Sequence, residues 1–163
     1  MNSVERILAT LAGNPVDRRA VAPVLCLYGA RLTGCPLDRY YTDPAAYAAG
    51  QAAVRATFQP DILFGPFDFA GIGAAFGSEL HWVPQQPPNV RRPAIRTVAE
   101  WETLALPDPD THPRLVFLRE AVRRMAAEHR GQVLVAAVLP PPIDLPALVM
   151  GMDAWMETVL FDP

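Results

Sequence analysis

The chain has 163 residues and a formal net charge of −3, and 51% of its residues are hydrophobic. That much apolar sequence rules out a disordered chain, and the length fits a single domain, which we place at residues 1–163. All fourteen basic residues are arginine, so the chain has no Schiff-base lysine and no phosphate-loop lysine, and its acidic balance argues against nucleic-acid binding.

No targeting or metal-binding pattern stands out. Glu5 and Arg6 interrupt the first apolar stretch, unlike a signal peptide, and Cys26 and Cys35 lack metal-binding spacing. The longest stretch without charged side chains, residues 131–143, is too short to span a bilayer and contains three prolines. We therefore expect a cytoplasmic protein with reduced thiols and no membrane contact.

The first third of the chain predicts two helices around one strand. Apolar residues at helical spacing indicate a helix over 3–12, with Asn2 and Glu5 as a capping pair. The continuous apolar run at 21–28 predicts a buried strand. A second helix is expected over 43–58, because Asp43 suits the N-cap and Pro44 suits the first helical position.

The middle of the chain predicts shorter elements. We expect a buried strand over 61–67, a short helix over 70–76 and a short strand over 80–83. Residues 84–96 read as an irregular proline-rich arm. Thr97 and Glu100 have the spacing of a capping box, which predicts a short helix ending at Leu104.

The last third predicts a long amphipathic helix over 112–130, a third buried strand over 132–139, and two helices at 145–150 and 153–160. His129 lies near the end of the long helix, where an imidazolium would suit the helix dipole. Apolar strands separated by helices indicate an α/β fold with a parallel sheet that is covered on both faces.

In parallel α/β folds, functional side chains gather beyond the carboxyl ends of the strands. Five residues occupy such positions and would suit a polar, partly anionic organic ligand: Tyr28, Arg31, Phe67, Asp68 and Asp144. Structural roles remain open for them. Asp68 and Asp144 each precede a predicted helix and could cap it, Tyr28 could be a core residue, and Arg31 could be a surface residue.

Several segments together resemble the uroporphyrinogen decarboxylase superfamily, which also contains corrinoid-linked methyltransferases. The resembling segments are DRRAVAP, YYTDPAAYAAGQ, QPDILFGPFDFAGIGAAFG, ALPDPD and the stretch from VLVAAVLPPPID to the final FDP. The spacing from Asp68 to Gly77 also matches the decarboxylases. The resemblance implies a (β/α)₈ barrel in which Asp68 accepts hydrogen bonds from the pyrrole N–H groups of a tetrapyrrole.

The chain also departs from both branches of that superfamily. Tyr28 stands where decarboxylases carry their first substrate-binding arginine, and Arg31 is displaced by one position from the second. The zinc ligands of the methyltransferase branch, His-x-Cys and a distant Cys, do not occur in this sequence. We therefore expect no cofactor held by this chain itself, although the related methyltransferases use zinc and a corrinoid and the decarboxylases use neither.

The resemblance reaches the Asp162-Pro163 dipeptide, roughly midway along a typical member of the superfamily. The expected fold is thus part of a TIM barrel, truncated after about three or four strands, with an open sheet edge. Alone, such a chain is expected to fold poorly or to associate with itself or with a chain that carries the C-terminal half.

Three functions follow as hypotheses. The first is a role in the corrinoid-linked methyltransferase-like branch, with a corrinoid protein as partner. The second is uroporphyrinogen decarboxylation in porphyrin biosynthesis. The third is a non-catalytic half-barrel that binds a tetrapyrrole or a partner chain.

Overall fold

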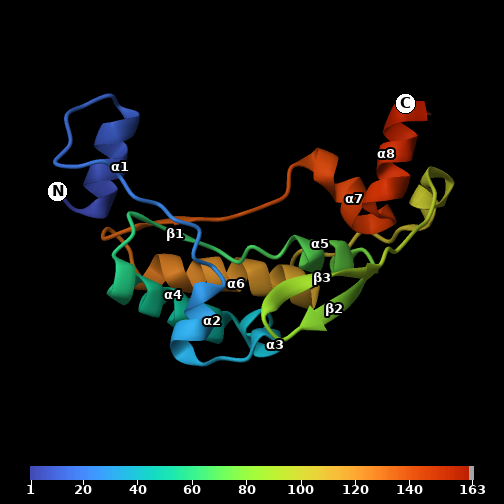
Figure 1. The fold of residues 1–163 in the computed structure, drawn as a ribbon, viewed down its shortest axis with the longest axis horizontal. Coiled ribbons are helices and arrows are strands. Elements are labelled where there is room, and N and C mark those ends of the chain that lie inside the picture. Colours follow the sequence, from blue (N-terminus) through green and yellow to red (C-terminus); the bar gives the residue numbers. More distant parts are fainter. Residues whose placement is uncertain (162–163) are drawn as a thin grey trace. The chain divides into compact units, whose positions relative to one another are not determined.

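The computed structural model describes residues 1–161, whose helices and strands are labelled in Figure 1. The chain divides into two compact units. The first unit consists of Met1–Phe67 and Leu118–Val138. The second consists of Asp68–Phe117 and the residues from Leu139 onward. The chain thus leaves the first unit, returns to it within one long helix, and leaves it again. The Asp162-Pro163 dipeptide of the family resemblance lies outside the described residues.

The first unit is built from helices around a small parallel sheet. Its elements are α1 (Ser3–Leu11), α2 (Tyr28–Thr33), α3 (Leu37–Tyr40), α4 (Pro44–Phe58), β1 (Ile62–Phe64), most of α6 (Pro113–Glu128) and β4 (Leu134–Ala136). Strands β1 and β4 pair in parallel, with Ile62 opposite Leu134 and Phe64 opposite Ala136. The pairing of strands far apart in sequence confirms the expected parallel α/β arrangement.

Local signals in the sequence correctly predict two helices of this unit, α1 and α4, but not α2 and α3. The Asn2 side chain accepts from the backbone N–H of Glu5, and the Glu5 side chain accepts from the N–H of Asn2, so the capping box of α1 is present. Asp43 caps α4 by accepting from Ala45 N at 2.8 Å. Both caps satisfy backbone N–H groups that have no partner within the helix.

The predicted strand at residues 21–28 is wrong. Asp61 N donates to Val21 O at 2.8 Å, but the chain from 21 to 27 is not assigned to a strand, and α2 begins at Tyr28. Pro23 contributes no N–H to a ladder, and Val21 and Val24 are exposed. An apolar run becomes a strand only where a neighbouring strand lies beside it.

A group of three buried tyrosines forms the centre of the first unit. The rings of Tyr40 and Tyr47 lie 4.8 Å apart between centroids, and those of Tyr40 and Tyr41 lie 5.6 Å apart. Helices α2 and α4 cross beside this group at Gly29 and Gly50. A Cβ on Gly29 would come within 2.7 Å of the Gly50 carbonyl carbon, so the crossing requires glycine.

The second unit combines a hairpin with short helices. Its elements are α5 (Phe69–Ala75), β2 (Glu79–Val83), β3 (Gln86–Arg92), the 3₁₀ helices η1 (Val98–Thr103) and η2 (Pro142–Asp144), α7 (Leu145–Met150) and α8 (Met152–Phe161). Gly151, with φ of 90°, separates α7 from α8, as the sequence predicted. Among residues 1–161, no helix is both long enough and apolar enough to cross a bilayer.

Two predictions for this unit need correction. The stretch at 84–96 is not an irregular arm throughout, because residues 86–92 form β3 and pair antiparallel with β2. Thr97 makes no side-chain cap, although Glu100 accepts from Arg96 N and from the Thr97 hydroxyl, and the helix that follows is a 3₁₀ helix. The strands predicted at 61–67 and 132–139 are confirmed, but each has only three residues in the sheet.

Candidate functional site

Asp68 lies a few residues beyond the carboxyl end of β1 and begins helix α5. Its Oδ1 accepts a hydrogen bond from Gly71 N at 2.9 Å, so the side chain caps the helix. This is the structural alternative that the sequence already offered for Asp68. The side chain is completely buried, and a buried carboxylate needs hydrogen-bond donors or an opposite charge.

Arg114, the second residue of α6, supplies that opposite charge. Its Nη2 donates to Asp68 Oδ2 at 2.5 Å, and its own side chain is only 13% exposed. The Arg114 guanidinium also lies over the ring of Trp82 on β2, with 5.6 Å between Cζ and the ring centroid. The site therefore joins α5, α6 and the hairpin of the second unit.

Burial raises the pKa of Asp68 above its usual value, while the charge of Arg114 and the N–H of Gly71 act to lower it. The desolvation of the carboxylate has the larger effect. Asp68 is consequently a carboxylate whose ionisation depends on the cation beside it.

Gly71 makes room for this arrangement. A Cβ at this position would lie 2.7 Å from Asp68 Cγ and 2.8 Å from Arg114 Nη2, too close for either group to stay in place. The glycine is needed here because a carboxylate and a guanidinium both approach the backbone of α5.

The other predicted site residues are distributed over both units. Tyr28, Arg31 and Phe67 belong to the first unit, whereas Asp68 and Asp144 belong to the second. Arg31 lies over the Tyr28 ring at 5.8 Å from its centroid, so the structure brings these two together. That all five residues bind the same ligand stays a prediction.

Four of these residues reach solvent. Arg31 is exposed, in agreement with the surface role that the sequence left open for it. Tyr28 is partly exposed, so it is not the core residue that the sequence left open as an alternative. Its ring packs edge-on against Phe58, with ring centroids 5.5 Å apart. Phe67 is exposed as well. Asp144 precedes α7 at the surface but makes no side-chain capping bond, so the cap suggested for it is not formed.

Sequence reasoning missed two residues of this site: Arg114, which contacts Asp68, and Trp82, which contacts Arg114. Arg114 is 46 positions from Asp68, and no local spacing links the two. The one available signal was the charge of Asp68. A buried carboxylate at the end of a strand predicts a partner of opposite charge, but it does not indicate which arginine that is.

A second polar network lies inside the first unit around Cys26. The Tyr40 hydroxyl and Gln51 Nε2 each donate to Cys26 O at 3.0 Å, and Cys26 Sγ contacts Gly65 O at 3.5 Å. Burial raises the pKa of the Cys26 thiol. A buried thiol that resists ionisation is a poor nucleophile, in line with a packing role.

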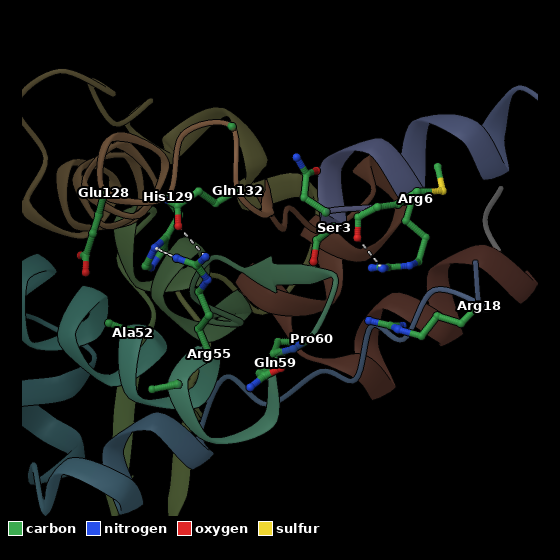
Figure 2. A pocket seen from close by; sticks show the side chains of 14 residues that line it. Ser3, Arg6, Arg18, Ala52, Arg55, Gln59, Pro60, Glu128, His129 and Gln132 are labelled. Atoms are coloured by element: carbon green, nitrogen blue, oxygen red, sulfur yellow. Dashed lines mark hydrogen bonds between the residues drawn. The ribbon is translucent and has the colours of Figure 1, made fainter. Parts of the chain in front are cut away.

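A hollow of about 770 Å³ opens elsewhere in the first unit (Figure 2). Pro60 and Gln132 line it, and they come just before β1 and β4, so the hollow lies at the amino ends of the strands. Chemistry in parallel α/β folds gathers at the opposite ends. Its remaining polar lining residues include Ser3, Arg6, Arg18, Arg55 and His129.

Arg55 forms hydrogen bonds with two other residues that line this hollow, His129 and Gln132. The Arg55 side chain donates to His129 Nδ1 at 2.9 Å and to Gln132 Oε1 at 2.6 Å, and both interactions are drawn as dashed lines in Figure 2. Because arginine only donates, Nδ1 accepts and the ring proton sits on Nε2. Burial, and to a lesser extent Arg55, lower the pKa of His129, so the imidazolium suggested by its place near a helix end is not favoured.

A metal site is not formed within residues 1–161. No group of three or more His, Cys, Asp or Glu side chains in this part of the chain is arranged to hold a metal ion. The described residues therefore do not fit the zinc of the related methyltransferases.

Comparison with known proteins agrees with the fold. The family described as uroporphyrinogen decarboxylase (URO-D) matches residues 2–163. No curated protein gives a significant match. Among solved structures, a methyltransferase from Methanosarcina mazei is similar with a TM-score of 0.83 and 18% sequence identity, and the match covers 99% of this chain and 49% of that one. The chain thus spans about half the length of this solved structure.

Proposed function

Because the chain belongs to the uroporphyrinogen decarboxylase family, we propose that it handles a tetrapyrrole-type macrocycle and works in methyl transfer with a corrinoid protein. The similarity to the Methanosarcina methyltransferase supports this branch. The departures at Tyr28 and Arg31 also favour it, since the substrate-binding arginines of the decarboxylases are not reproduced there. When bound, a corrinoid would supply the carrier of the methyl group.

The observation that carries the proposal is the buried Asp68 carboxylate near the carboxyl end of β1. The hydrogen bonds that it accepts from Gly71 N and Arg114 Nη2 leave acceptor capacity, because a carboxylate has about four lone-pair sites. We propose that this carboxylate accepts N–H groups of the macrocycle or its amide side chains, with Tyr28, Arg31, Phe67 and Asp144 as further binding residues. A negative charge in a dry site acts more strongly than in water.

Decarboxylation of uroporphyrinogen is the second candidate. The same carboxylate would then receive the pyrrole N–H groups and favour the cationic ring that forms before carbon dioxide leaves. The spacing from Asp68 to Gly77 supports this alternative.

A binding function without catalysis is the third candidate. Each proposal includes a partner that completes the site. This partner is a second copy of the chain, or a chain that folds like the part of the methyltransferase that this chain does not match.

A binding titration separates the first two candidates. The purified chain is titrated with hydroxocobalamin and, separately, with uroporphyrin I, and the absorbance shift or fluorescence quenching is followed. Saturable binding of the cobalamin supports the methyltransferase branch, and saturable binding of the porphyrin supports the decarboxylase. Failure to bind either would overturn the proposal.

Variants connect the binding to Asp68. Asp68→Asn removes the charge and is expected to weaken binding about tenfold or more, the loss typical of a charged hydrogen bond. Asp43→Asn is the matched control, because Asp43 also caps a helix but belongs to the other unit. Equal affinity in all three proteins would remove Asp68 from the proposal.

A further inference from the structure

We propose that Arg114 is the positioning residue of the Asp68 site, holding the buried carboxylate charged and fixing the direction of its oxygens. This inference rests on the proposed role of Asp68 as the carboxylate that meets the macrocycle. Arg114 itself is assigned no contact with the ligand.

The geometry gives each oxygen of Asp68 its own donor. Oδ1 is held by Gly71 N at 2.9 Å, and Oδ2 by Arg114 Nη2 at 2.5 Å. Two donors from different elements, α5 and α6, prevent the carboxylate from turning about its bond to Cβ. The lone pairs that remain on the two oxygens then point in a fixed direction.

The charge of Arg114 compensates for burial of the carboxylate. The elements packed against α5 carry other charged or titratable groups: Glu79 and His81 on β2, Arg91 and Arg92 on β3, and Asp144 before α7. Asp108 and Asp110 precede α6, the helix that carries Arg114. Glu79 pairs with Arg92. Within the described part of the chain, Arg114 is the charged side chain that shifts the pKa of Asp68.

Trp82 in turn positions Arg114. The guanidinium lies 5.6 Å from the centroid of the indole, a cation–π distance, and the hairpin thereby limits the positions open to the arginine. A lysine at position 114 keeps the charge but loses the planar group that stacks on Trp82. Charge and orientation can therefore be separated by substitution.

The test measures the titration of Asp68 directly by carboxyl ¹³C NMR of the aspartate-labelled chain, with Asp68→Asn to assign the signal. Removing the opposite charge in Arg114→Met is expected to raise the midpoint by about one pH unit or more, because the Gly71 N–H alone then opposes the effect of burial. Arg114→Lys should keep most of the wild-type midpoint. Arg124→Met is the control, since Arg124 is an exposed arginine of the same helix.

Three outcomes decide the inference. An unchanged Asp68 midpoint in a folded Arg114→Met protein overturns it. If Arg114→Met fails to fold, the double variant Asp68→Asn/Arg114→Met becomes decisive, because removing the uncompensated carboxylate should restore folding. A double variant that still fails to fold would show that Arg114 acts through packing, which also overturns the inference.

The NMR measurement needs no ligand, so the inference and the proposed function can fail separately. A raised midpoint without any binding of hydroxocobalamin or uroporphyrin I supports the inference and counts against the proposed function. Where binding is present, the pH at which affinity is half-maximal should rise in Arg114→Met and stay unchanged in Arg124→Met.

Discussion

Asp61 shows at the scale of a single residue how the first unit is held together. Its side chain is fully buried, and it accepts from Arg6 Nη1 at 2.6 Å, Arg18 Nη1 at 2.7 Å and Val21 N at 2.8 Å. These contacts join α1 and the following loop to the start of β1. Arg6 also pairs with Asp17, whose pKa is lowered mainly by this hydrogen bond.

Asp61→Asn should destabilise the chain strongly, because it leaves the buried Arg6 and its neighbour Arg18 without their shared anion. Breaking a buried ion pair typically costs about 3 kcal/mol or more. Urea denaturation followed by circular dichroism measures the loss. Arg123→Gln is the control: it breaks the exposed pair with Glu120 and should cost about 0.5 kcal/mol at most.

Acid should weaken the same cluster in a defined pH range. Burial acts to raise the pKa of Asp61, but the hydrogen bonds from Arg18, Val21 N, Ser3 and Arg6 outweigh it and lower the pKa to about 2. A lowered pKa in the folded state stabilises above the unfolded value of 3.8, and this contribution disappears as the pH falls towards 2. Wild-type melting temperature should therefore fall between about pH 4 and pH 2 by more than that of Asp61→Asn, and equal slopes would contradict the assignment.

At the scale of helices and strands, three predicted caps are confirmed, because a cap depends on neighbours in sequence, whereas the caps predicted for Thr97 and Asp144 are not formed. The caps by Asn2, Asp43 and Asp68 all join residues two or three positions apart. The ion pairs of Asp68 and Asp61 span 46 and 55 positions, and no spacing rule reaches that far.

Asp43 and Asp144 each precede a helix, but Asp43 makes a side-chain capping bond and Asp144 does not. Their variants therefore test how much this bond stabilises the chain. Asp43→Ala should cost about 1 kcal/mol, because the capping bond to Ala45 N is lost. Asp144→Ala should change stability by less than about 0.5 kcal/mol, since its exposed side chain makes no such bond. Thermal or urea unfolding of both variants compares them, and equal losses would show that the cap geometry does not matter.

Strands were harder to predict than helices, for a physical reason. The run at 21–28 is as apolar as a buried strand, yet residues 21–27 lie in no strand. Residues 86–92 look unsuited to a sheet because of Pro87 and Pro88, yet they pair with β2. Proline is tolerated in a strand that pairs on one side only. Whether a segment joins a sheet depends on its neighbours in space.

At the scale of the whole molecule, helix α8 presents an apolar stripe to solvent. Met152, Met156, Val159 and Leu160 recur at helical spacing and are between 43% and 63% exposed. Isolated apolar side chains are common at protein surfaces, but a continuous stripe of this kind is typical of an interaction surface.

We expect the chain to associate through this stripe as its concentration rises. Sedimentation or light scattering over a concentration series measures the association, which the double variant Met156→Glu/Leu160→Glu should reduce. Leu106→Glu is the control, because Leu106 is an exposed apolar residue in the loop between η1 and α6, outside α8. An unmodified chain that stays monomeric throughout would contradict the expectation.

The two units also share the chain in an alternating order, since residues 118–138 return to the first unit after the second has begun. A cut in the exposed loop at Leu106 would therefore separate no unit from the other. Each of the two pieces would contain parts of both, with β1 on one and β4 on the other. The loop at Leu106 is thus a natural split point for fragment complementation, in which two separately produced pieces regain the fold only by assembling with each other.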